Sequence, residues 1–119
     1  MNDAKLSRAF SLLESAIEQC TTDRGNQLLH AALAKAFETT FEYLWKALKR
    51  EADQAGLETY SPRDALKAAA QLKLIDDLEL WNQFLNARNL SVHDYVGMED
   101  EEMIGLVRQF RDRLRSLLT

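Results

Sequence analysis

The chain has 119 residues and a formal net charge of −4, and 46% of its residues are hydrophobic and 29% charged. These values are typical of one folded domain and exclude a wholly disordered chain. The single cysteine excludes an internal disulfide framework, and together with two histidines it is too little for a Cys/His zinc cage within one chain. Without a signal-peptide pattern or a run of about 20 apolar residues, we expect a cytoplasmic protein. The negative charge opposes nucleic-acid binding unless positive residues gather locally.

The first half of the chain predicts two helices. An apolar stripe with steps of three and four residues indicates the first, and it consists of Leu6, Phe10, Leu13 and Ile17. Turn and capping residues at 21–26 lead to a second helix from about Asn26 to Ala55, with Gly56 as a left-handed cap. Its stripe consists of Leu29, Leu33, Phe37, Phe41, Leu44 and Leu48. A helix of roughly 45 Å exceeds what the core of one such domain needs, so we expect part of it to serve a partner.

Capping patterns predict further helices in the second half. Ser61 is a capping residue, Pro62 suits the first helical position, and Asp64 stands where a capping-box acid would. The segment Asp76-Asp77-Leu78-Glu79 repeats the cap-x-x-acid pattern and opens a helix with Trp81, Phe84, Leu85 and Arg88 on a similar side. Gly97 and the acidic run at 99–102 precede a last helix, whose apolar residues are Met103, Leu106, Val107, Phe110, Leu114 and Leu117. We therefore predict an all-α, up-and-down bundle of four to five helices in one domain, residues 1–119.

The segment 88–95 holds the residues most suited to chemistry. A histidine can move the proton of a ribose 2′-hydroxyl, and an arginine can grip a phosphate with two parallel hydrogen bonds, so Arg88 and His93 could support metal-free phosphoryl transfer at RNA. Five residues of unbroken helix separate two side chains by about 140°, so the pair converges only where the helix ends or bulges. Asn89 and Ser91 permit such a break. The competing interpretation is a plain helix end, where both side chains cap carbonyls or face solvent.

Other polar residues have simpler interpretations. We expect His30, among leucines and alanines, to be a packing residue, and Cys20 to be a small residue at least partly buried at a helix end. Glu42 and Lys46 have the spacing of a surface ion pair on a helix. Four arginines suit the last helix through its dipole, namely Arg108, Arg111, Arg113 and Arg115. They are also the densest positive patch, which would favour RNA binding only if the patch faces Arg88 and His93.

Arg88, His93 and Tyr95 match the R-x4-H-x-Y pattern of the HEPN superfamily. The sequence resembles in particular its HepT-like members, the nucleotidyltransferase substrate-binding proteins. Further matches follow the family's order and spacing, from Phe41-Glu42-x-x-Trp45-Lys46-x-Leu48-Lys49 through Ser61-Pro62-Arg63, Leu74-Ile75-Asp76-Asp77 and Leu80-Trp81 to Arg88-Asn89-Leu90. The resemblance covers roughly Phe37 to Tyr95. Leu78, where a small residue is expected, and Val92 and Asp94 beside His93 depart from the pattern.

The resemblance implies a symmetric homodimer that acts as a metal-independent RNase toxin at a dimer cleft and needs no cofactor. His93 would transfer protons, Arg88 would bind the phosphate and 2′-hydroxyl, and Asn89 and Asp94 would orient the motif. A partner minimal nucleotidyltransferase, the antitoxin, would neutralise the toxin by adenylylating Tyr95. Two alternatives remain open: a non-catalytic substrate- or nucleotide-binding subunit of a two-component nucleotidyltransferase, and a helical interaction module without chemistry.

Overall fold

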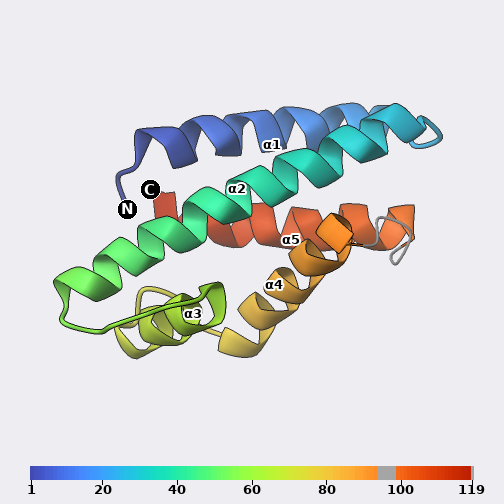
Figure 1. Cartoon of the computed structure of the whole chain (residues 1–119). Helices are drawn as coiled ribbons and strands as arrows, with labels where there is room; N and C mark the ends of the chain where they lie inside the picture. The colour runs from blue at the N-terminus through green and yellow to red at the C-terminus, as the bar shows by residue number, and fades with distance from the viewer. Residues whose placement is uncertain (94–98, 119) are drawn as a thin grey trace.

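The computed structural model describes residues 1–93 and 99–118, with side chains for 1–90 and 99–118. These residues form five α-helices and no strand. The helices are α1 (Ala4–Thr22), α2 (Gln27–Gln54), α3 (Pro62–Gln71), α4 (Leu78–His93) and α5 (Asp100–Leu118). The predicted all-α class and helix number are confirmed. In Figure 1 the long helices α1, α2, α4 and α5 alternate in direction along the chain, as an up-and-down arrangement requires.

Three of the predicted capping signals act as expected. The Asn26 side chain accepts the first backbone N–H groups of α2, and Gly56 follows this helix with a φ of 80°. Ser61 Oγ accepts the backbone N–H of Asp64 at 3.1 Å, and the Asp64 carboxylate accepts the N–H of Tyr60 at 3.1 Å. Because donors left over at a helix start must find acceptors, these contacts fix where α2 and α3 begin.

The start of α4 differs from the prediction by one residue. Asp77, not Asp76, caps the helix, since its Oδ1 accepts the backbone N–H of Leu80 at 3.3 Å. Asp76 instead forms an ion pair with Arg113 of α5, with 3.1 Å between Oδ1 and Nη1. The partner of Asp76 lies 37 positions further along the chain, so the local cap-x-x-acid pattern could not reveal it.

The core surrounds α2, which packs against all four of the other helices. Its centre is an aromatic cluster on α2, α4 and α5 in which Phe110 is fully buried. The ring of Phe110 lies 5.0 Å from that of Phe37, 5.5 Å from Phe84 and 5.9 Å from Phe41, between ring centroids. The predicted apolar residues of the last helix therefore face inward, and α5 is held to the bundle by aromatic packing.

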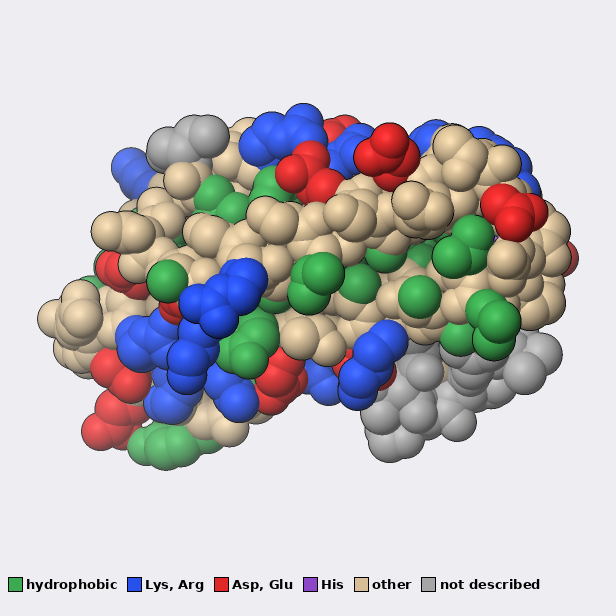
Figure 2. Space-filling model, turned by 90° about the horizontal axis from the view of Figure 1, so that it is seen from above, with side chains coloured by type: hydrophobic (Ala, Val, Ile, Leu, Met, Phe, Trp, Pro, Cys, Tyr) green, Lys and Arg blue, Asp and Glu red, His purple; other side chains and the backbone are tan. Residues whose placement is uncertain are grey.

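The outer side of α1 and α2 carries a shallow groove of about 400 Å³. Of the described residues that line it, Lys35 alone is charged, and Leu12 leaves 66% of its surface exposed. Figure 2 shows hydrophobic side chains along the middle of this face and Lys and Arg side chains gathered towards its left end. The expectation that part of α2 serves a partner stays a prediction. Among the described helices, none combines the length and apolar character needed to cross a membrane.

Candidate functional site

Arg88 extends from α4 towards α2 and is largely enclosed, with 17% of its side chain exposed. Its guanidinium carbon lies 5.7 Å from the centre of the Phe41 ring, a cation–π distance. Its Nη2 lies 3.6 Å from Oε2 of Glu42, the next residue of α2. An aromatic ring and a carboxylate, both on α2, therefore hold the guanidinium. Most of the Arg88 side chain is shielded from water.

Glu42 contacts more than Arg88. Its Oε2 accepts a hydrogen bond of 3.0 Å from the indole Nε1 of Trp45, and its Oε1 lies 3.4 Å from Nζ of Lys46. The pair with Lys46 confirms the prediction for these two residues. Sequence reasoning missed the contacts with Trp45 and Arg88. The three-residue spacing of Glu42 and Trp45 was a usable signal for the first, whereas the second joins two helices and has no local signature.

The helix α4 is continuous from Arg88 to His93. Its backbone is helical from Leu78 to His93, so the break that Asn89 and Ser91 would permit does not occur between Arg88 and His93. Positions 88 and 93 consequently stand about 140° apart around the helix axis. Asn89 is exposed beside Arg88. The side chain of His93 and the residues Asp94 and Tyr95 lie outside the part of the chain that the structure describes.

The four arginines of α5 do not form one strip. Arg108 donates to Thr21 Oγ1 at 2.8 Å and Arg115 pairs with Glu14, so both face α1. Arg113 instead pairs with Asp76 before α4, and Arg111 pairs with its neighbour Asp112. The condition for a common positive patch with Arg88 is therefore not met, and these contacts favour a structural role.

His30 and Cys20 are packing residues, as predicted. His30 is 2% exposed, and its Nε2 donates to the backbone oxygen of Arg24 at 2.5 Å. Its Nδ1 is then free to accept from the Cys20 thiol at 3.3 Å. Burial, and next the Asp100 carboxylate, raise the pKa of the Cys20 thiol. Because the reactive form of cysteine is the thiolate, this site disfavours a nucleophilic role.

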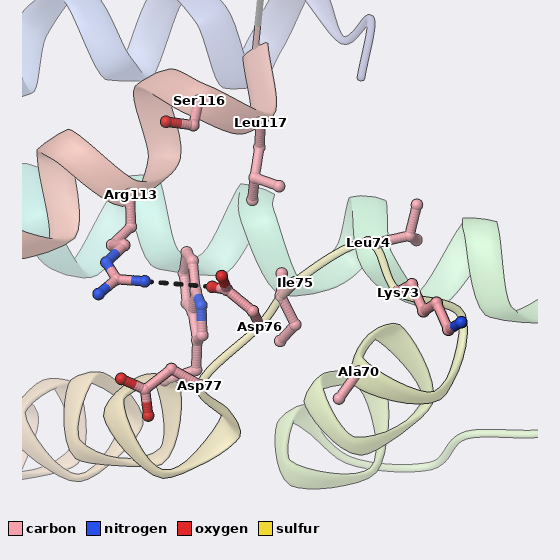
Figure 3. Close-up of a pocket in the computed structure, with 10 residues that line it drawn as sticks. Ala70, Lys73, Leu74, Ile75, Asp76, Asp77, Arg113, Ser116 and Leu117 are labelled. Carbon is pink, nitrogen blue, oxygen red and sulfur yellow. Dashed lines mark hydrogen bonds and ion pairs between the residues drawn. The ribbon is translucent and has the colours of Figure 1, made fainter.

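A separate hollow of about 650 Å³ lies between the end of α3, the start of α4 and α5. The Arg113–Asp76 ion pair spans it, and Lys73, Leu74 and Asp77 lie around it in Figure 3. Two cations and two carboxylates line the hollow, so their formal charges cancel. Of the residues predicted for the site, the two whose side chains the structure describes, Arg88 and Asn89, do not line it. Among the described residues no three His, Cys, Asp or Glu side chains are grouped to hold a metal ion.

Comparison with known proteins finds a matching family model and a similar protein. Residues 2–119 match the model of the family described as "nucleotidyltransferase substrate binding protein like". The chain is also similar to a protein of Haemophilus influenzae named "Probable ribonuclease HepT". The two are 28% identical over 123 aligned positions, which cover 92% of this chain and 82% of the relative. Because the family model spans nearly the whole sequence, the chain belongs to the nucleotidyltransferase substrate-binding-like family.

Proposed function

We propose that the chain is a ribonuclease toxin of the HEPN type that cleaves RNA without a metal ion. The observation that carries the proposal is the placement of Arg88, enclosed against Phe41 and Glu42 at the start of the R-x4-H-x-Y motif. A relative named as a probable ribonuclease supports the reaction class. An enclosed guanidinium interacts more strongly with a phosphate than one in open water, because less solvent screens the pair.

The reaction divides between two residues. His93 takes the proton of the ribose 2′-hydroxyl, whose oxygen then attacks the adjacent phosphorus and displaces the 5′-oxygen of the next nucleotide. The departing 5′-oxygen receives a proton in exchange, so the proton that His93 took is returned overall. Arg88 binds the phosphate and stabilises the negative charge that develops on it. Asn89 and Asp94 orient the motif. The products are a 2′,3′-cyclic phosphate and a 5′-hydroxyl end, and no step needs a cofactor.

Helix geometry favours a site built by two copies of the chain. Because α4 is regular from Arg88 to His93, the two positions of one copy face different directions. In a symmetric homodimer the motif of each copy faces that of the other, so Arg88 of one copy can meet His93 of its partner across the two-fold axis. This arrangement also explains how a chain of net charge −4 can bind RNA: the symmetry doubles the positive charge at the cleft.

Regulation acts on Tyr95. A partner minimal nucleotidyltransferase transfers the adenylyl group of ATP to the Tyr95 hydroxyl, forming a phosphodiester and releasing pyrophosphate. The added nucleotide brings bulk and negative charge to the cleft, and both oppose entry of RNA. The partner is thus the antitoxin.

A second candidate is a non-catalytic substrate- or nucleotide-binding subunit of a two-component nucleotidyltransferase. The description of the family favours it, as does the separation of the α5 arginines, which leaves no common positive strip for RNA. This candidate predicts nucleotide binding only by the complex of both chains and no toxicity of this chain alone.

One experiment separates the two. Purified wild type, Arg88→Ala and His93→Ala are incubated with RNA in EDTA, after intact mass has shown Tyr95 to be unmodified. The ribonuclease proposal expects cleavage by wild type only. Equal inertness of wild type and both variants would reject it and favour the binding subunit.

A further inference from the structure

Glu42 is held in place by its own helix. One carboxylate oxygen accepts the indole N–H of Trp45 at 3.0 Å and the other lies 3.4 Å from the Lys46 ammonium. Both neighbours are on α2, so they fix the direction of the carboxylate independently of α4. A surface glutamate with a single lysine partner would have much more freedom.

The contact of Glu42 with Arg88 joins this fixed carboxylate to the motif. Oε2, the oxygen that Trp45 holds, is also the one that lies 3.6 Å from Arg88 Nη2. Phe41 supports the guanidinium from the same turn of α2, and its ring is fully buried against Phe37 and Phe110. The arginine therefore meets two rigid groups on a helix that is itself anchored in the core.

We propose that Glu42 is the positioning residue that orients the Arg88 guanidinium for a phosphate of RNA, with Trp45 and Lys46 holding the two Glu42 oxygens. This inference rests on the proposed function, because it assigns the phosphate to Arg88. Glu42 does not touch RNA. Its carboxylate restricts the rotamers of a long side chain, so that the guanidinium meets the phosphate in one orientation.

Three variants of α2 test the proposal by steady-state cleavage of a short RNA. Glu42→Ala removes the carboxylate, Glu42→Gln keeps an acceptor for the Trp45 N–H without the charge, and Trp45→Phe keeps a ring without the donor. The matched control is Glu38→Ala. Glu38 precedes Glu42 by one turn, has a similar exposure (32% against 42%) and pairs only with Lys35 among the described ion pairs.

The expected result is a rise in KM and a fall in kcat for Glu42→Ala, together about tenfold in kcat/KM, with Glu42→Gln between it and wild type. Glu38→Ala matches wild type. Trp45→Phe falls in the same direction, and the double variant Glu42→Ala/Trp45→Phe is no worse than Glu42→Ala, because Trp45 acts through Glu42. A loss of folded protein alone would lower the apparent kcat and leave KM unchanged. A rise in KM therefore distinguishes a positioning role from a loss of folded protein.

Several outcomes would overturn the proposal. Glu42→Ala could behave as Glu38→Ala does, or its KM could fall, which would mean that Glu42 competes with the phosphate for Arg88. If the losses of kcat/KM in the two single variants add up in the double variant, Trp45 does not act through Glu42. If wild type and Arg88→Ala both leave RNA uncut, the proposed function itself fails. That outcome is distinct from active wild type with an unaffected Glu42→Ala.

Discussion

Phe110 is the residue whose loss should most weaken the bundle. It is fully buried, and its ring lies within 6.1 Å, between centroids, of Phe37, Phe41, Trp81 and Phe84. Truncation to alanine removes about 2 kcal/mol of transfer free energy. It also leaves a cavity on the order of 100 Å³, which at about 24 cal/mol per Å³ costs about 2 kcal/mol more. The expected loss is therefore about 4 kcal/mol of the free energy of unfolding, a large part of the roughly 5–15 kcal/mol that stabilises a domain.

Urea unfolding followed by far-UV circular dichroism measures this loss. Wild type, Phe110→Ala and the control Gln109→Ala are compared at one protein concentration, because binding between copies would make stability depend on it. Gln109 is the exposed neighbour of Phe110 on the same helix, so its truncation should change the free energy by less than about 0.5 kcal/mol. A loss below about 2 kcal/mol for Phe110→Ala, or equal losses for both variants, would refute the assignment of Phe110 to the centre of the core.

Two further predictions concern local chemistry. Gly56→Ala should lower stability by about 1 kcal/mol because φ is 80°, whereas Gly105→Ala, inside α5 with open space around it, should raise it by about 0.5–1 kcal/mol. Thermal melting checks both, and shifts of the same sign would contradict the backbone argument. The Cys20 thiol should react much more slowly with a chromogenic disulfide reagent in the native protein than in urea at the same pH, since it is fully buried and its pKa is raised. Equal rates in both states would show that the thiol is accessible.

Local signals predicted the fold well. The stripes of α1 and α2, the caps Asn26 and Ser61 and the glycine at 56 all depend on residues within one or two turns, and these were confirmed. The prediction that Asp76 caps α4 was wrong, because a local pattern cannot distinguish Asp76 from Asp77. Only the ion pair of Asp76 with Arg113, which joins distant parts of the chain, distinguishes them.

The site was predicted less completely, for the same physical reason. Arg88 could be selected from the motif, but its contacts with Phe41 and Glu42 arise where α4 meets α2, and sequence spacing contains no information about that meeting. The α5 arginines looked like one patch along the sequence. On a helix, residues two apart do not share a face, so Arg113 pairs with Asp76 before α4, whereas Arg108 and Arg115, two turns apart, both contact α1.

The position of α2 in the bundle has a consequence for how the molecule opens. α1 packs against α2 and α5, and α3 packs against α2 and α4, so outer helices can separate locally while α2 keeps other neighbours. The central amides of α2 should then exchange with solvent only when the whole domain unfolds. Glu42, Trp45 and Phe41 belong to these central turns. We therefore expect the residues that hold Arg88 to keep their geometry while the surrounding helices open locally.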